Sequence, residues 1–293
     1  MHAHLTIHCA LRHGLFALLL CGLAPLAANA GSRLAFTGAT TSIEGGAGAG
    51  LATWALIGGL GTEDEWSPTI ALSRAETQDF SLDVAAVSIG AWNRVELSFA
   101  RQRFDAGSVV PGLTLGQDIV GMKLRVAGDA IFDGDRLWPQ LSVGLQHKKT
   151  RDFDFIPTAV GAKRDSATEV YVSATKLYFA ALANRDVIVN ATLRRTDANQ
   201  YGLLGFGGPT RSGAAWRPEL SLGIWPHERV LVGVEYRDKA DALSAFGEDA
   251  ALDAFVAWAP NRRIMLVAGW LDLGSIAGSA PQRGSYLSLW ASY

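Results

Sequence analysis

The stretch Val230–Arg237, with the sequence VLVGVEYR, decides the fold. Its even-numbered residues are apolar, and from Gly233 onwards its odd-numbered residues are glycine or charged. Because successive side chains of a β-strand point to opposite faces, this alternation predicts a strand with one apolar face and one face that carries an acid–base pair. An apolar outer face with a polar inner face is typical of a strand in a transmembrane β-barrel.

The same alternation recurs along most of the chain, with further clear examples at 120–126, 141–148, 187–194 and 219–224. One such segment is a weak signal, because any half-buried strand alternates, so the repetition carries the weight. Although 49% of the residues are hydrophobic, no apolar run after residue 30 reaches the roughly 20 residues of a membrane-spanning helix. A water-soluble β-sandwich is the alternative fold.

The connections between the expected strands alternate in length, which favours the barrel over the sandwich. Short connections fall at 92–94, 129–136, 183–186, 226–228 and 260–262, and longer ones at 105–116, 151–167, 197–216, 239–250 and 274–283. Outer-membrane barrels have short periplasmic turns and longer extracellular loops. The chain ends on Tyr293 in an alternating strand, which resembles the C-terminal signal that the barrel-assembly machinery recognises, so we expect that machinery as a partner.

Residues 1–30 have the features of a cleaved signal peptide. An apolar run is followed by Ala28-Asn29-Ala30, a site of the kind that signal peptidase cuts. A lipoprotein anchored at Cys21 is less consistent, because Leu20 occupies a position that needs a small residue. Both cysteines, Cys9 and Cys21, lie in this leader, so the mature chain offers neither a disulfide nor a thiolate metal site.

The mature chain, residues 31–293, is therefore predicted to be all-β, a transmembrane antiparallel up-and-down β-barrel of 12–14 strands in the bacterial outer membrane. The count is open because residues 31–61, which include the glycine-rich stretch 45–50, either add a strand or lie partly in the lumen. The charge balance of 26 Lys and Arg against 28 Asp and Glu offers no basic excess for nucleic acid. We expect outer-membrane lipid and lipopolysaccharide as surroundings.

The chain resembles an uncharacterised proteobacterial outer-membrane β-barrel family, catalogued as a domain of unknown function. The matching stretches are TSIEGG at 41–46, VELSFARQRF at 95–104, ANQYGLLGFGG at 198–208, AWAPN at 257–261 and QRGSYLSL at 282–289. These stretches are spread over nearly the whole mature chain. The resemblance implies an outer-membrane location and a barrel fold, and it supplies no activity.

Strand parity assigns a set of polar and charged side chains to the lumen: Asp83, Glu96, Lys123, Arg125, Gln146, Lys148, Glu169, Arg194, Glu219, Glu235, Arg237 and Asp253. Such a mixed interior either lines an aqueous pore or fills the barrel with salt bridges. Barrels of about 8 strands are filled by side chains and those of 16–18 leave a channel, so 12–14 strands fall between the two cases.

Two segments are candidates for a plug, namely 45–50 and the loop that contains Gly202, Gly205, Phe206 and Gly207. Both combine bare backbone with few charges, which suits close approach inside a lumen, and an ordinary surface loop is the alternative. Arg101 and Arg103 continue an outward parity towards the extracellular rim. There they could pair with lipopolysaccharide phosphates, unless a bulge turns them inward.

Catalytic residue patterns are scarce. The mature chain has two histidines, and His227 lies in an expected turn. His147 is the one candidate base for a barrel lipase, and Ser142 is on the opposite face of the same strand. We expect no metal and no cofactor. The sequence thus favours a narrow channel or binding protein for small hydrophilic solutes, with a non-conducting structural or surface-binding barrel second and a lipid-modifying enzyme third.

Overall fold

The computed structural model describes residues 33–133, 136–211 and 213–293, in which twelve strands form a closed antiparallel barrel. The predicted signal peptide, residues 1–30, lies outside the described residues. The barrel strands are β3 (Trp66–Thr77), β4 (Ser81–Ala91), β5 (Val95–Asp105), β6 (Thr114–Ala127), β7 (Gln140–Thr150), β8 (Ser166–Leu182), β9 (Arg185–Thr196), β10 (Ala215–His227), β11 (Val230–Arg237), β12 (Ala251–Asn261), β13 (Ile264–Asp272) and β14 (Arg283–Ser292).

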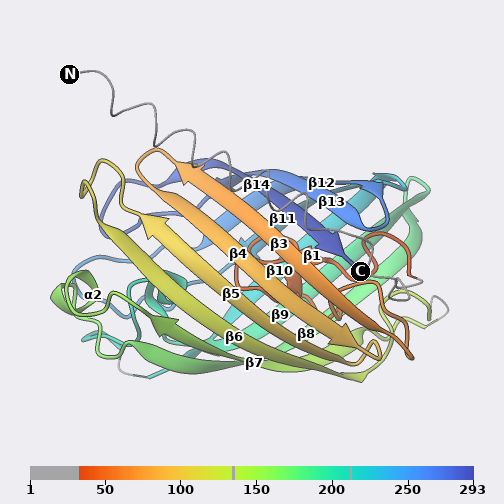
Figure 1. The fold of residues 1–293 in the computed structure, drawn as a ribbon, viewed down its shortest axis with the longest axis horizontal. Coiled ribbons are helices and arrows are strands. Elements are labelled where there is room, and N and C mark those ends of the chain that lie inside the picture. The colour runs from red at the N-terminus through yellow and green to blue at the C-terminus, as the bar shows by residue number, and fades with distance from the viewer. Residues whose placement is uncertain (1–32, 134–135, 212) are drawn as a thin grey trace. The chain divides into compact units, whose positions relative to one another are not determined.

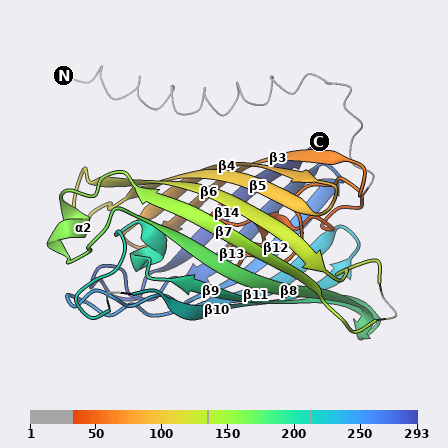
Figure 2. The same cartoon turned by 90° about the horizontal axis from the view of Figure 1, so that it is seen from below.

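Each strand pairs with the next along the chain, and β14 pairs with β3 to close the barrel (Figure 1 and Figure 2). Thr69 of β3 lies opposite Ser292, so the last strand ends beside the start of the first. Closure leaves no free strand edge, so the backbone groups of the wall are satisfied within the barrel, as a membrane requires. The predicted up-and-down barrel is confirmed with twelve strands.

The outer face of the barrel is apolar where the strands alternate. In the stretch Val230–Arg237, Val232 and Val234 are exposed outside while Glu235 and Arg237 are buried inside. Neighbouring strands continue the band with Val87, Leu97, Val120, Met122, Val143, Leu145, Val170, Val172, Val189, Leu193, Leu220, Leu222, Leu252, Val256 and Leu287. None of the described helices is long and apolar enough to cross a membrane.

The inner face of the barrel has two unlike arcs. Four adjacent strands, β13, β14, β3 and β4, present small and apolar side chains such as Val267, Trp290, Ala71 and Val84, and no buried charge. The remaining strands, β5 to β12, carry the buried acids and bases. The buried charges of the wall therefore lie on eight adjacent strands, and the four strands that complete the ring carry none.

Residues 33–61, which we call the plug, contribute no strand to the barrel wall. They contain a two-stranded antiparallel sheet of β1 (Thr40–Thr41) and β2 (Ala47–Gly48), and almost all of them are buried. Their partners lie on strands all around the inner wall, from Asn93 after β4 to Glu235 on β11. This segment occupies the lumen and is not an additional wall strand.

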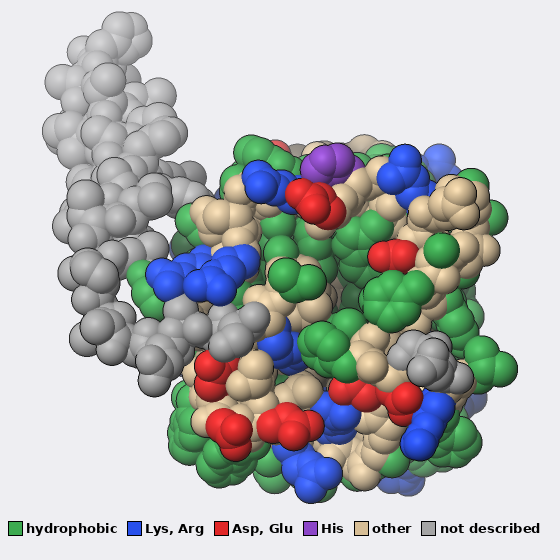
Figure 3. Space-filling model, turned by 90° about the vertical axis from the view of Figure 1, so that its right-hand side faces the viewer, with side chains coloured by type: hydrophobic (Ala, Val, Ile, Leu, Met, Phe, Trp, Pro, Cys, Tyr) green, Lys and Arg blue, Asp and Glu red, His purple; other side chains and the backbone are tan. Residues whose placement is uncertain are grey.

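The two ends of the barrel differ in their connections. The end that carries the C-terminus has mostly short turns, and acidic and basic side chains are interspersed over it (Figure 3). The opposite end carries longer loops, including α2 (Ile156–Ala159) and the 3₁₀ turn η1 (Asn199–Gly202). The predicted alternation of short and long connections is present, and we take the long-loop end as extracellular.

Candidate functional site

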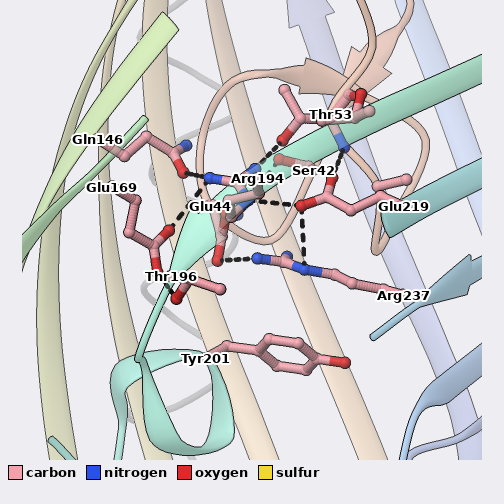
Figure 4. Close-up of polar contacts among 12 residues, drawn as sticks. Ser42, Glu44, Thr53, Gln146, Glu169, Arg194, Thr196, Tyr201, Glu219 and Arg237 are labelled. Carbon is pink, nitrogen blue, oxygen red and sulfur yellow. Dashed lines mark hydrogen bonds and ion pairs between the residues drawn. The ribbon is translucent and has the colours of Figure 1, made fainter. Parts of the chain in front are cut away.

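Glu44 of the plug is the centre of a buried ion-pair cluster (Figure 4). Its Oε1 accepts hydrogen bonds from Lys148 Nζ at 2.5 Å and Arg237 Nη2 at 2.6 Å. Its Oε2 lies 3.4 Å from Arg194 Nη2. Lys148, Arg194 and Arg237 come from β7, β9 and β11, so one plug side chain binds cations from three separate strands.

Two carboxylates of the wall complete the cluster. Glu219 Oε1 lies 2.5 Å from Arg194 Nε and 3.4 Å from Arg237 Nε. Glu169 Oε2 lies 2.8 Å from Lys148 Nζ and 3.2 Å from an Arg194 nitrogen. Three cations therefore face three carboxylates, of which only Glu44 belongs to the plug.

The cluster is fully desolvated, since the side chains of Glu44 and Lys148 are 0% exposed. Burial by itself raises the pKa of Glu44, but the charges of Arg237, Lys148 and Arg194 outweigh burial and hold this pKa below its ordinary value. Arg194 Nη1 also donates to Gln146 Oε1 at 2.5 Å. This contact satisfies part of the hydrogen-bonding capacity of the cluster, which buried ion pairs require. Glu44 Oε2 and Gln146 Nε2 have no hydrogen-bond partner among the described residues.

Carboxylates of the wall also bind the backbone of the plug. Glu235 Oε2 accepts the N–H groups of Gly50, Leu51 and Ala52 at 2.9, 2.7 and 3.2 Å, and its Oε1 accepts the indole N–H of Trp54 at 3.1 Å. An irregular segment has unpaired N–H groups, and a buried carboxylate needs donors, so each satisfies the other. A negative wall residue thereby fixes a turn of the plug.

An acid–base pair on β5 and β6, Glu96 and Lys123, also binds the backbone of the plug. Glu96 accepts the N–H of Ala47 at 3.2 Å and that of Gly58 at 2.7 Å. Its partner Lys123, 3.2 Å away, donates to the carbonyl of Leu56 at 3.0 Å. One acid and one base thus bind the donors and acceptors of the same stretch of plug.

Glycine residues allow the plug to approach the wall closely. A Cβ on Gly90 of β4 would lie 2.1 Å from the carbonyl oxygen of Gly58. A Cβ on Gly50 would lie 2.8 Å from both Asp253 Oδ2 and Tyr286 Oη. The glycine-rich composition of the plug therefore reflects backbone packed against backbone and against side-chain oxygens.

The long loop between β9 and β10 reaches the cluster from the extracellular end. Phe206 is completely buried and pairs through its backbone with Arg164 of the preceding loop. Gly202 accepts a hydrogen bond from Thr150 at 2.5 Å, and the ring of Tyr201 lies 4.3 Å from the Arg237 guanidinium. This loop, which contains the predicted Gly202, Gly205, Phe206 and Gly207, therefore reaches the cation that holds Glu44 (Figure 4).

The β9–β10 loop also contacts Lys239 and Glu248, which lie in the loop between β11 and β12. Gln200 N–H donates to both oxygens of Glu248 at 3.0 and 3.1 Å, and Lys239 donates to Gln200 Oε1 at 3.0 Å. Burial raises the pKa of Glu248 to about 7, which Lys239 partly offsets. Burial lowers the pKa of Lys239 to about 8, against the opposing charge of Glu248.

An apolar cavity of about 130 Å³ lies beneath the extracellular loops. Its lining includes Ile43 and Leu51 of the plug together with Leu82, Phe104 and Leu115 of the wall. A cavity lined in this way gives water few hydrogen-bonding partners. The plug therefore borders both the buried ion-pair cluster and an apolar cavity.

The structure brings most of the predicted lumen residues together. Glu96, Lys123, Gln146, Lys148, Glu169, Arg194, Glu219, Glu235, Arg237 and Asp253 are buried inside the barrel, where nearly all of them contact the plug or one another. Asp253 accepts a hydrogen bond from Tyr286 at 3.1 Å. Arg125 also points inward, but it lies at the short-turn end and pairs with Asp129 at 2.9 Å.

The prediction for Asp83 was wrong. This side chain is on the outer face, 51% exposed, and pairs with Arg74 at 2.8 Å. Val84 and Ala86 point inward instead. The stretch VAAV at 84–87, which follows Asp83, is apolar on both parities, so the alternation did not distinguish inside from outside there.

Arg101 and Arg103 lie exposed on the outer face of β5 towards the extracellular end, and Arg101 pairs with Asp118 at 2.9 Å. Their binding to lipopolysaccharide, like contact of the C-terminal strand with the assembly machinery, stays a prediction. His147 is also on the outer face, where its Nδ1 lies 3.0 Å from Thr168 Oγ1. Ser142 is buried inside and bonds the plug carbonyl of Ala55.

Sequence reasoning missed Glu44 as a site residue. Glu44 is the one acid in residues 33–61, a segment otherwise composed of small and apolar residues and a single arginine, Arg33. A lone carboxylate in such a segment was the available signal. Tyr201 was missed too, because an aromatic in a long loop carries no pattern that predicts contact with a lumen arginine.

A closed antiparallel barrel with an apolar outer band and a polar interior is the architecture by which proteins cross the bacterial outer membrane. Similar solved structures include Omp33 of Acinetobacter baumannii, with 7% identity and a TM-score of 0.47 over 79% of this chain and 100% of that chain. The KdgM porin has 8% identity and a TM-score of 0.47 over 77% and 99% of the two chains. The NanC porin has 8% identity and a TM-score of 0.46 over 76% and 98%.

No curated protein matches the chain. A family model described as "Protein of unknown function (DUF3034)" matches residues 37–290, which is most of the chain and includes the plug from Thr37 onwards and all twelve strands of the barrel up to Trp290. This outer-membrane β-barrel therefore belongs to the DUF3034 family.

Proposed function

We propose that this protein is a gated passage for small hydrophilic solutes, closed by the plug. The observation that carries the proposal is that the lumen is filled by a segment that forms no part of the wall. A twelve-stranded barrel is wider than the roughly eight strands that wall side chains can fill. Removal of residues 33–61 would leave every strand of the wall in place and take the plug out of the lumen.

The uneven placement of the lumen charges, which lie on β5 to β12 and not on β13, β14, β3 or β4, supports passage over a purely structural role. Burying an ion pair stabilises a protein no better, as a rule, than packing apolar side chains of similar volume. The arc from β13 to β4 packs against the plug without any charge. The charges on β5 to β12 are therefore not required to fill the barrel, and they suit a wall that water reaches once the plug moves.

Single-channel conductance in a planar bilayer tests the proposal. The mature protein is expected to be silent or to open rarely, and a variant without residues 33–61 is expected to show steady discrete steps. Circular dichroism of the deleted variant should retain the β-sheet signal, because no wall strand is removed. A folded but silent deletion variant, or a complete chain that conducts as steadily as that variant, would contradict the gate.

The ion preference of the deletion variant tests whether the current passes through the lumen. Glu235→Lys reverses a charge inside the barrel and is expected to shift the reversal potential towards anion preference. Asp83→Lys makes the same kind of charge reversal on the outer face and serves as the matched control, with no expected shift. Equal shifts from both variants would show that the current does not follow the lumen.

A further inference from the structure

We infer that Lys148, Arg194 and Arg237 form a binding site for the carboxylate of a small solute, which Glu44 occupies while the plug is in place. The inference rests on the proposed passage, because the site becomes free only when the plug leaves. While the plug is docked, Glu44 is an internal ligand, and its contacts show what the site recognises (Figure 4).

The geometry fits a carboxylate group. One oxygen of Glu44 receives Lys148 and Arg237 at 2.5 and 2.6 Å, and the other faces Arg194 at 3.4 Å. Three cations from three strands thus converge on the two oxygens of one planar anion. Each arginine reaches Glu44 through one nitrogen: Arg237 donates a hydrogen bond, and Arg194 contributes its charge to the second oxygen, which accepts no hydrogen bond from the described residues.

The charge of the wall fits a monoanion. Without Glu44, the cations Lys148, Arg194 and Arg237 face only two carboxylates, Glu169 and Glu219. One positive charge is then uncompensated in a place that the wall otherwise balances. A monocarboxylate restores neutrality, whereas a phosphate or sulfate dianion would add a negative charge in excess.

While the plug is docked, burial strengthens the contacts that the three cations make with Glu44. The side chains of Lys148, Arg194 and Arg237 are exposed by no more than 3%. Salt screens such charges much less than it screens surface charges. Aromatic rings fix the two guanidinium groups, with Tyr171 4.8 Å from Arg194 and Tyr201 4.3 Å from Arg237. The cations are therefore held in position by wall and loop residues and not by Glu44 alone.

Chemical rescue tests the site without requiring passage. Glu44→Ala removes a group with the composition of acetate, so acetate should fill the space and supply the missing charge. The measurement is hydrogen exchange at the amides of Gly50, Leu51 and Ala52, whose bonds to Glu235 report that the plug is docked. We expect Glu44→Ala to speed this exchange at least ~10-fold. Acetate should then restore protection by the ratio of its affinities for the buried site of the docked state and for the open site of the undocked state, because salt and water weaken the open site more.

The controls isolate the carboxylate. Acetamide has the same shape without the charge, and chloride has the charge without the shape, so neither should restore protection. Glu63→Ala removes an exposed acid just after the plug and should leave the exchange unchanged. Rescue by acetamide or chloride as strong as that by acetate, or no rescue by acetate, would overturn the inference.

The deletion variant without residues 33–61 provides a second test that does not depend on how Glu44→Ala folds. Acetate should carry current through it more readily than sulfate, and Arg237→Gln should reduce that preference several-fold. A conducting variant without this preference would overturn the carboxylate site and leave the gate standing. Rescue by acetate with a silent deletion variant would keep the site and remove the passage.

Discussion

Glu248 shows how one residue can make a loop contact pH-dependent. It lies in the loop between β11 and β12 and accepts the Gln200 N–H with both oxygens. Its pKa of about 7 in the folded protein lies above the ordinary value of 4.5. The folded state therefore binds the proton more tightly than an opened state, in which the carboxyl group is solvated.

The sign of the effect follows from proton linkage. Between pH 4.5 and 7 the docked loop holds more protons than the opened loop, so its stability falls as pH rises. The total loss is on the order of 3 kcal/mol. Hydrogen exchange at the Gln200 amide, corrected for the intrinsic rate, should show protection decreasing through pH 7. Glu248→Gln should abolish this dependence, and an unchanged pH profile in that variant would contradict the assignment.

The plug is the element whose docking depends on glycine, which has no side chain. Its backbone is held by carboxylates such as Glu235 and Glu96, which require close approach, and glycine permits it on both sides of the interface. The glycine run of the plug was visible in the sequence as a candidate for the lumen. The sequence did not show which glycine of the wall faces the plug. Nothing in the strand of Gly90 distinguishes it from a glycine that faces water.

Gly90→Ala should therefore weaken docking of the plug. The added Cβ would meet the carbonyl oxygen of Gly58 at 2.1 Å, so backbone must shift, at a cost of about 1–3 kcal/mol. Gly247→Ala adds the same methyl group where nothing lies within 4 Å and is the control. Exchange at the Gly58 amide measures the effect, and similar exchange in both variants would count against the close contact.

At the scale of the whole molecule, the apolar outer band defines the part of the barrel that lies in lipid. Val234 is in the middle of this band on β11, with Leu222 and Ala254 opposite it on the neighbouring strands. Its neighbour Glu235 points into the lumen and contacts the plug. Adjacent residues of one strand thus meet the two most different environments of the protein.

Val234→Arg should destabilise the barrel by about 2–4 kcal/mol, because it places a charge in the hydrocarbon region. Leu137→Arg, in the connection between β6 and β7 where the side chain is 81% exposed, should change stability by no more than about 0.5 kcal/mol. Unfolding by urea from lipid vesicles measures both. Equal costs for the two substitutions would mean that the band does not lie in the membrane.

The sequence by itself determined the barrel, because side-chain alternation and connection lengths are local properties. It also assigned most lumen charges, and it failed at Asp83, because the residues that follow it are apolar on both parities. Only the tertiary structure decided that residues 33–61 fill the lumen and that Glu44 meets Lys148, Arg194 and Arg237. Those contacts join residues more than a hundred positions apart, and closure of the ring of strands brings them together, which no local pattern records.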